Sequence, residues 1–511
     1  MMQKYLQVGA GNPRRRFLIA VARYLSNGDT FRPFQDIPGP RSFPIIGTLY
    51  KYFPVIGDYQ FERLHRNGEK KLAQYGKIVR EEIVKGTNLV WLFDPVDIET
   101  LFRHGEGKHP QRLSHLAVLH FRLTRREVYN TGGLLPTNGP DWARLRTVFQ
   151  KSLSKPQNVR IYIPMMDEVL RDFVKLIERT ACRSPVEDFL NELSRLSLEQ
   201  TGLVAFDERL GGIAEEPMLL CEKLLEAALT INSCVLGTDQ GLHLWKKFKT
   251  PLYKKMERAM LHLEKVAIEF VERKKAHLET NKTADNRVGQ SLSLLEQFLQ
   301  SPDLDRKDVI GMVVDMLLAG ADTTAYSSSF ALYHLATNPE KQRLLHEEAR
   351  SLLPTPDSRI TTQTLSDAAY TKAVLKESLR LNPISVGVGR ILQHDSVFSG
   401  YNVPKGTVVV TQNQVSCRQP SNFKRPNDFL PERWLRGHEL NEPVHPYLTL
   451  PFGHGPRACI AKLLAEQNIQ MMLLRIAREF HITWEGHDSL DSISLLINKP
   501  DRPLRLQFHK I

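Results

Sequence analysis

The sequence predicts one large, mainly helical domain with a minor β portion. Apolar residues recur with the 3.6-residue helical period from about residue 95 onward. The chain has no internal repeat or low-complexity tract, and its 41% apolar and 25% charged residues are typical of a globular protein. Its length alone would suggest about three domains. Because no obvious linker divides the chain after its N-terminal part, we expect a single core.

The chain begins with a basic segment that carries no acidic residue. Residues 1–28 contribute five basic side chains to the net charge of +12: Lys4, Arg14, Arg15, Arg16 and Arg23. The apolar run 17–22 is too short for a membrane span, which needs about 20 residues, and too short for a secretory signal. This composition predicts a mitochondrial transit peptide over residues 1–30. The alternative is a basic terminus that targets nothing.

Prolines and glycines then mark the entry to the folded body. Residues 31–47 are predicted to form a proline-rich connector, after which a single domain spans residues 48–511. Within this domain, β-branched residues predict strands in 78–84 and 88–93, and strands with a turn in 397–415. The remaining periodic stretches predict helices.

Cysteine usage and charge restrict the class of protein. The five cysteines are an odd number spread far apart, with no C-x-x-C pair: Cys182, Cys221, Cys234, Cys417 and Cys459. This pattern argues against a disulfide framework or a zinc ribbon and favours a reducing compartment. The positive charge comes without a nucleic-acid-binding motif or an aromatic and basic stripe, so we expect no nucleic acid partner. A docking patch for an acidic protein accounts for the charge better.

Residues 451–461, PFGHGPRACIA, place Cys459 in a loop rich in glycine and proline. The apolar residues that follow recur at helical spacing, so Cys459 lies at or just before a helix N-terminus, where the helix dipole favours the thiolate. Gly453 and Gly455 allow the backbone to approach a ligand closely, and Arg457 adds positive charge. A metal-ligating thiolate, a nucleophile assisted by His454 and an unreactive buried cysteine all remain open.

A second unusual stretch is the apolar segment 305–340, which predicts a core helix that is closed by Pro339. Its centre holds Gly320, Asp322 and Thr323, residue types that are unfavourable in a helix interior. Such a local conflict often marks a functional site. The alternative is that Thr323 hydrogen-bonds its own helix backbone and only bends the helix.

Two further stretches place charged and aromatic residues on one helix face. Glu377 and Arg380 are three residues apart and can pair, with Arg433 as a second cation for the carboxylate, although exposed pairs of this kind are common. Trp142 and Arg146 share a face that suits an anionic group. A surface arginine beside a packed tryptophan is the alternative for that face.

Together and in this order, these stretches resemble the cytochrome P450 superfamily of haem-thiolate monooxygenases from about residue 36 onward. The resemblance implies the cytochrome P450 fold, with haem between a long central helix and the helix after the cysteine loop. The family usually has glycine two residues after the cysteine, where this chain has Ala461, and we expect this difference to be tolerated. The motifs that carry the resemblance are Phe452-x-x-Gly455-x-Arg457-x-Cys459, Glu377-x-x-Arg380, Pro431-Glu432-Arg433 and Ala319-Gly320-x-Asp322-Thr323.

The resemblance implies how haem b would be held. Cys459 would be the axial ligand of the haem iron, in a loop that includes Phe452 and Gly455. Four residues would face the haem propionates: Trp142, Arg146, Arg390 and Arg457.

It also implies the catalytic residues. Asp322 and Thr323 would deliver protons while dioxygen is activated, and Gly320 would leave room for dioxygen. A buried structural network near the haem would be formed by Glu377, Arg380 and Arg433.

Within the superfamily the chain resembles the mitochondrial class. Lys372 and Lys376 match the lysines that dock a 2Fe-2S ferredoxin in that class, and Lys462 remains from a second basic motif. The class implies electrons from NADPH through ferredoxin reductase and a mitochondrial ferredoxin. It also implies a peripheral position on the matrix side of the inner membrane. Lysines that only increase solubility are the alternative.

Several stretches, such as LLPTNGPDW and KESLRLNPISVGVGRIL, are similar to those of insect ecdysteroid 22-hydroxylases. The similarity implies oxygen insertion into the C22–H bond of a steroid in moulting-hormone synthesis. The candidate substrate-lining segments are 114–119, 232–235, Ala319 and 384–388. The alternatives are a mitochondrial monooxygenase for another steroid position or another sterol, and a non-catalytic haem sensor or steroid carrier. A cysteine hydrolase is disfavoured because no oriented base occurs in a recognised pattern.

Overall fold

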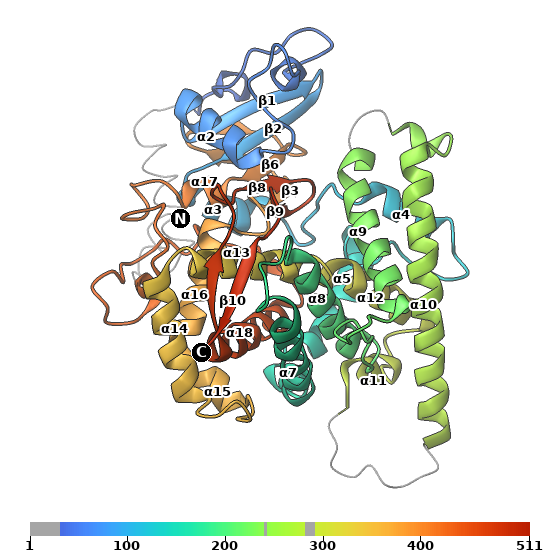
Figure 1. Ribbon diagram of the computed structural model, residues 1–511. Helices are drawn as coiled ribbons and strands as arrows, with labels where there is room; N and C mark the ends of the chain where they lie inside the picture. Colours follow the sequence, from blue (N-terminus) through green and yellow to red (C-terminus); the bar gives the residue numbers. More distant parts are fainter. Residues whose placement is uncertain (1–30, 240–242, 282–291) are drawn as a thin grey trace, which may run out of the picture.

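The computed structural model describes residues 31–239, 243–281 and 292–511. Within these ranges the protein is mainly helical with a minor β portion, which confirms the predicted fold class (Figure 1). The predicted transit peptide, residues 1–30, lies outside the described residues.

Helices make up most of the described chain. Periodic apolar stretches form them, and several begin with a capping side chain; for example, Asp305 accepts a hydrogen bond from Asp308 N. The α-helices are α2 (Leu64–Tyr75), α3 (Pro95–Thr100), α4 (Leu116–Leu123), α5 (Gly139–Leu153), α6 (Pro156–Arg160), α7 (Ile163–Thr180), α8 (Leu190–Ala205), α9 (Leu219–Asp239), α10 (Pro251–Asn281), α11 (Leu294–Leu299), α12 (Arg306–Gly320), α13 (Thr323–Ala336), α14 (Pro339–Leu352), α15 (Thr362–Asp367), α16 (Ala369–Leu381), α17 (Asn413–Ser416) and α18 (Lys462–Glu479). The shorter helical turns are η2 (Phe34–Asp36), η3 (Leu49–Tyr52), η4 (Leu101–Gly105), η5 (Leu244–Lys246), η6 (Pro431–Trp434) and η7 (Gly455–Arg457).

The strands form small sheets, and the predicted strand segments are confirmed. In the four-stranded sheet the order is β1-β2-β6-β3, in which β2 pairs with β6 in parallel and the other pairs are antiparallel. The pairs β4–β5, β7–β10 and β8–β9 are antiparallel. The strands are β1 (Ile78–Val84), β2 (Thr87–Leu92), β3 (Gly389–Ile391), β4 (Ser396–Phe398), β5 (Tyr401–Val403), β6 (Val408–Thr411), β7 (Phe480–Trp484), β8 (Ser492–Ser494), β9 (Asn498–Pro500) and β10 (Leu506–Lys510).

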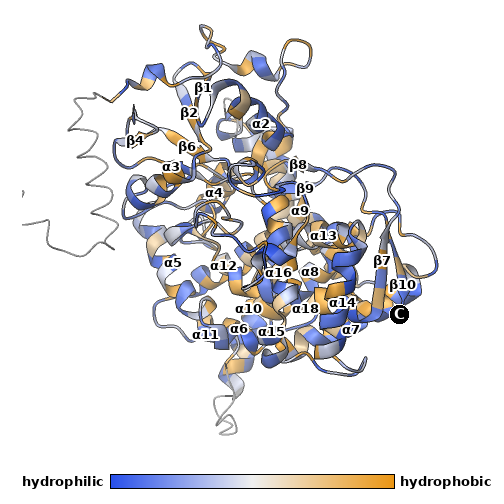
Figure 2. Ribbon diagram, turned by 90° about the vertical axis from the view of Figure 1, so that its left-hand side faces the viewer, coloured by the Kyte–Doolittle hydropathy of each residue, from blue (hydrophilic) through white to orange (hydrophobic). Residues whose placement is uncertain are grey.

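Helices α12 and α13 lie in the middle of the molecule, and β1 and β2 lie at one end of it (Figure 1). Helix α12 packs against α8, α9 and α10, whereas α13 packs against α8, α16 and α18. Orange and blue stripes along the surrounding helices in Figure 2 show their hydrophobic and hydrophilic faces. In the described part of the chain, 306–336 is the one helical stretch long and apolar enough to cross a membrane, but 67% of its apolar 18-residue part is buried, as in a core helix pair.

The segment predicted as a connector packs against the four-stranded sheet. Arg80 N on β1 donates to Pro38 O at 2.9 Å, and Ile37 is buried in the core beside β1 and β2. Phe43 and Gly47 form an isolated β-bridge. Proline and glycine therefore shape a segment that lies on the folded body, rather than one that stands apart from it.

Candidate functional site

The loop that carries Cys459 is closed by its own backbone. Cys459 N donates to Phe452 O at 2.8 Å, and the loop runs through η7 to the start of α18. Gly453 and Gly455 have φ angles of 72° and 71°, a left-handed conformation that side chains with a Cβ rarely adopt. The loop thus presents the cysteine three residues before a helix N-terminus, as the sequence predicted.

The Cys459 side chain is exposed at the surface of the loop, although the surrounding protein atoms still desolvate its thiol. Burial raises the pKa of the Cys459 thiol, and the Ala461 N–H group and the Arg146 charge offset this only in part. The N–H group and the arginine charge thus lower the pKa of the thiol as expected, but without a bound metal ion desolvation has the larger effect. A metal ion bonded to sulfur would supply the missing positive charge, since thiol ligands bind metals in their deprotonated form.

Three guanidinium groups converge on the Cys459 loop. Arg457 lies over the Trp142 ring at 3.9 Å and donates to Thr137 O at 2.6 Å. Arg146 donates to Ala458 O at 2.7 Å, so α5 contacts the residue next to the cysteine. The third is Arg112, in the segment before α4, which donates to Leu135 O at 2.8 Å. Sequence reasoning missed Arg112, because no motif or helical spacing marks it.

These three cations have no carboxylate partner among the described residues. Within residues 31–239, 243–281 and 292–511, Arg112, Arg146 and Arg457 form no ion pair, whereas Arg390 pairs with Glu106 at 2.5 Å. Burial and the neighbouring arginine charges lower the pKa of Arg112 to about 10 and that of Arg457 to about 9. The groups stay protonated at neutral pH, so the site carries positive charge that an anionic ligand would neutralise.

Arg390 has protein partners on both sides. It pairs with the buried Glu106 carboxylate at 2.5 Å and donates to His454 O at 3.3 Å, while its contact with the haem propionates stays a prediction. Arg390 thus holds the cysteine loop in position. Arg112, unlike Arg390, has no carboxylate partner among the described residues.

The donor set fits haem. An accessible thiol next to guanidinium groups without counter-charges matches an iron porphyrin with two propionates, because thiolate suits iron and guanidinium suits carboxylate. In the described part of the chain, no group of three or more His, Cys, Asp and Glu could hold a metal ion by side chains alone. The metal chemistry of this site therefore rests on one thiolate and on a ligand that brings its own metal.

The central helix is broken where its sequence predicted a conflict. Helix α12 ends at Gly320 and α13 begins at Thr323, so the predicted single core helix is two helices with a turn between them. A Cβ atom at Gly320 would clash with the Thr201 side chain on α8. The missing side chain of Gly320 thus makes room for α8, and its role in leaving room for dioxygen stays a prediction.

Asp322 lies buried in this turn. Its Oδ2 accepts a hydrogen bond from Asn232 Nδ2 on α9 at 2.8 Å, and Oδ1 has no hydrogen-bond partner in the described part of the chain. Burial raises the pKa of Asp322 to about 6, against the lowering effect of Asn232. Thr323 donates from Oγ1 to Ala319 O at 2.6 Å, the backbone bond that the alternative reading predicted. Ala319 is exposed near the end of a mostly buried helix, so this face of α12 is open to a ligand.

Glu377, Arg380 and Arg433 form one buried network. Both Glu377 oxygens accept from Arg380 at 2.8 Å, and Oε1 also accepts from Arg433 Nε at 2.9 Å. Burial raises the pKa of Glu377, but the bonds and charges of the two arginines outweigh it, so the pKa lies below its ordinary value. The carboxylate therefore stays ionised in the interior.

The predicted docking lysines lie on α16 and at the start of α18. Lys376 and Lys462 are exposed, and both charges act on Glu466 of α18. Lys372 is half-buried and donates to Ser366 O at 2.6 Å. The structure thus brings Lys376 close to Lys462, which is far from it in sequence.

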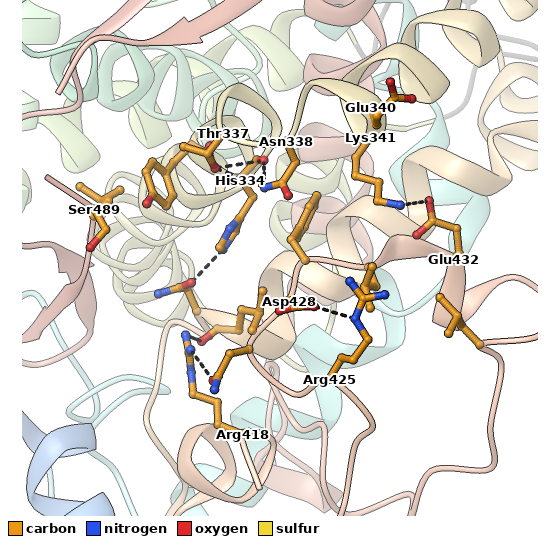
Figure 3. Close-up of a pocket in the computed structure, with 18 of the residues that line it drawn as sticks. His334, Thr337, Asn338, Glu340, Lys341, Arg418, Arg425, Asp428, Glu432 and Ser489 are labelled. Atoms are coloured by element: carbon orange, nitrogen blue, oxygen red, sulfur yellow. Dashed lines mark hydrogen bonds and ion pairs between the residues drawn. The ribbon is translucent and has the colours of Figure 1, made fainter. Parts of the chain in front are cut away.

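A cavity of about 1010 Å³ lies elsewhere, between α2, α13, α14 and the loops after α17 (Figure 3). None of the predicted site residues lines it. Several of its charged side chains pair with one another: Lys341 with Glu432 at 2.8 Å and Arg425 with Asp428 at 2.7 Å. Its size does not make it the reactive site, because the thiol and the guanidinium groups without counter-charges lie outside it.

Comparisons with known proteins agree with this geometry. The family description "Cytochrome P450" matches residues 37–508. The chain is 48% identical to cytochrome P450 302a1, mitochondrial, of Drosophila melanogaster, over 93% of this chain and 94% of that protein. It is 33% identical to the probable cytochrome P450 12a5, mitochondrial, of the same species, over 93% of this chain and 91% of that protein.

Proposed function

The chain belongs to the cytochrome P450 family, and on this premise we propose that it is a mitochondrial haem-thiolate monooxygenase that hydroxylates C22 of an ecdysteroid precursor. The accessible Cys459 thiol beside three guanidinium groups without carboxylate partners carries the haem assignment. The 48% identity to a mitochondrial relative over most of both chains supports the compartment and class. The substrate follows from the similarity to ecdysteroid 22-hydroxylases.

Residues of this chain would hold haem both at its iron and at its propionate groups. Cys459 would ligate the haem iron, and Arg112, Arg146 and Arg457 would bind the propionates. Bound haem supplies dioxygen activation with two electrons, for which a thiolate ligand favours O–O cleavage. Arg390 keeps the cysteine loop in place through Glu106 and His454 O.

Asp322 is suited to proton transfer. A carboxyl group with a pKa near 6 can hold a proton at Oδ1 and release it near neutral pH. Asn232 fixes the orientation of this carboxyl from α9. Thr323, whose hydroxyl donates to Ala319 O, lies one residue further along the chain and would relay the proton.

The electron donor would be a 2Fe-2S ferredoxin, itself reduced by NADPH through ferredoxin reductase. Its docking surface would include Lys372, Lys376 and Lys462, positively charged groups at the start of α18 and on α16. Because α18 follows the Cys459 loop directly, a partner on this face would lie close to the thiolate side of the haem.

Exposed apolar side chains support peripheral attachment to the inner membrane on the matrix side. Ile45, Val55 and Ile56 are 80%, 95% and 74% exposed, and Phe248 beyond α9 is 58% exposed. Exposed apolar groups of this extent mark protein or membrane contacts. Lysines 246, 247 and 249 around Phe248 are exposed as well, which suits an anionic lipid surface.

The decisive experiment is turnover of a steroid with an unoxidised C22 by the purified protein with ferredoxin, ferredoxin reductase and NADPH. We expect a 22-hydroxylated product, identified by mass spectrometry and NMR. A product hydroxylated elsewhere would refute the C22 assignment. A protein without the thiolate signature in its ferrous carbon monoxide spectrum would refute the haem assignment.

A further inference from the structure

The segment between α4 and α5, residues 131–138, is the platform that holds two of the haem-facing guanidinium groups. Arg112 donates to Leu135 O at 2.8 Å and to Leu134 O at 3.3 Å. Arg457 donates to Thr137 O at 2.6 Å and to Leu134 O at 3.4 Å. The directions of both cations therefore depend on where the carbonyl groups of this segment lie.

A buried ion pair fixes the platform from behind. Arg122 of α4 and Asp315 of α12 pair at 2.8 Å, with side-chain exposures of 0% and 5%. Arg122 Nη1 also donates to Gly132 O at 2.9 Å, and Asp315 Oδ2 accepts from Leu134 N at 2.6 Å. Each charge thus binds the platform backbone as well as its partner.

Gly133 shows how closely the pair and the platform fit. Its φ angle is 87°, and a Cβ atom there would clash with both Arg122 Nη1 and Asp315 Oδ2. The backbone at this position must be glycine for the two charges to reach residues 132 and 134.

A gain in folding stability does not by itself explain why a buried ion pair occupies this position. A buried ion pair is often no better than well-packed apolar residues, because both charges lose their hydration. Arg122 Nε and Nη2 have no hydrogen-bond partner in the described part of the chain, so two donors of the buried pair form no hydrogen bond. The pair does form two hydrogen bonds to the platform, which orients Arg112 and Arg457.

We propose that Arg122 and Asp315 are positioning residues for the haem, which act by holding residues 131–138 so that Arg112 and Arg457 face the propionates. The inference rests on the proposed function, since it requires haem at the Cys459 loop. Neither residue touches the cofactor in this assignment; each acts through the backbone of the platform.

The test compares two matched buried pairs in the haem-loaded protein. Asp315→Asn has one acceptor oxygen for two donors, so it must weaken either the Arg122 contact or the Leu134 N contact. The control is Asp167→Asn, which weakens the equally buried Arg475–Asp167 pair between α7 and α18. The probes are the rate of haem loss to an excess of apomyoglobin and the midpoint potential of the haem iron.

We expect Asp315→Asn to lose haem about tenfold faster, because displaced cations hold the propionates less firmly. The midpoint potential is decisive for Gly133→Ala, because loss of the Asp315 charge by itself makes that potential more positive. Asp167→Asn should lower the unfolding temperature but leave both haem readouts at the parent values. Equal haem readouts in Asp315→Asn and the parent would overturn the proposal, as would equal shifts in both variants.

Gly133→Ala provides a second perturbation that keeps both charges. Its Cβ would displace the platform, so Gly133→Ala should also lose haem faster. Because it removes no charge, it should have a more negative midpoint potential, since weaker cation contacts stabilise ferric haem relative to ferrous haem. If neither Asp315→Asn nor Gly133→Ala accumulated while Asp167→Asn did, the pair would be a folding element and the proposal would be overturned. A parent protein without a thiolate-haem spectrum would instead mean that the proposed function itself had failed.

Discussion

Replacing Glu377 by glutamine should remove the one carboxylate that pairs with both Arg380 and Arg433 in the described part of the chain. The fully buried Glu377 side chain accepts bonds from Arg380, Arg433, Leu430 N at 3.0 Å and Trp434 Nε1 at 2.9 Å. Removal of one partner from a buried ion pair costs about 3–5 kcal/mol, because a charge is left without compensation. This is a large share of a total unfolding free energy of about 5–15 kcal/mol.

The pH dependence of this contribution has a definite sign. The pKa of Glu377 lies below its ordinary value in the folded protein. Its stabilisation is therefore complete above the ordinary carboxyl pKa of about 4.3 and is lost as the pH falls through the lower folded value.

The assay is urea unfolding of parent and variants, followed by circular dichroism. Glu442→Gln is the matched control, because Glu442 pairs with Lys424 at the surface, where the side chains are 43% and 73% exposed and the expected cost is about 0–1 kcal/mol. Trp434→Phe removes one bond to Glu377 and should cost about 1.5–3 kcal/mol, which keeps the test informative if Glu377→Gln fails to fold. A Glu377→Gln protein as stable as Glu442→Gln would refute the reasoning.

Three further outcomes follow from the site. Cys459→Ser should abolish the thiolate signature in the ferrous carbon monoxide spectrum, and an unchanged Soret band would contradict the assignment of the ligand. Asn232→Ala should raise the pKa of Asp322 further above its value of about 6, because the amide bond lowers that pKa, so the midpoint of the pH profile of turnover should move to higher pH; the same midpoint in parent and variant would exclude Asp322 as the titrating group. Lys372→Ala combined with Lys376→Ala should raise several-fold the ferredoxin concentration needed for half-maximal turnover and leave steroid binding intact, whereas equal ferredoxin dependence would remove this docking surface.

Much of the fold and part of the site were predictable from short segments. Helical periodicity predicted the mainly helical fold, and β-branched runs predicted β1, β2 and β4 to β6. The unfavourable residues at 320–323 marked an unusual position in a predicted single core helix, but the break at Ala321 and Asp322 was not predicted. These features depend on residues a few positions apart, so their signal lies in the local pattern.

The contacts that the sequence did not predict all involve residues that are distant in sequence. Gly320 is explained by Thr201 on α8, and Arg390 by Glu106, 284 positions away. Arg112 entered the site only because the segment before α4 folds against the Cys459 loop. The pKa of the Cys459 thiol is raised although a helix follows it, because burial is a property of the whole surrounding structure.

The sequence by itself determined the helical framework, the family resemblance and the identity of the candidate thiolate, because each depends on the order and spacing of residues close together in the chain. Only the tertiary structure decided which charges meet. It paired Arg390 with Glu106 and Arg122 with Asp315, and among the residues it describes it left Arg112, Arg146 and Arg457 without a carboxylate partner. The reason is that Coulomb energy and desolvation depend on distance and burial in space, which separation along the chain does not reveal.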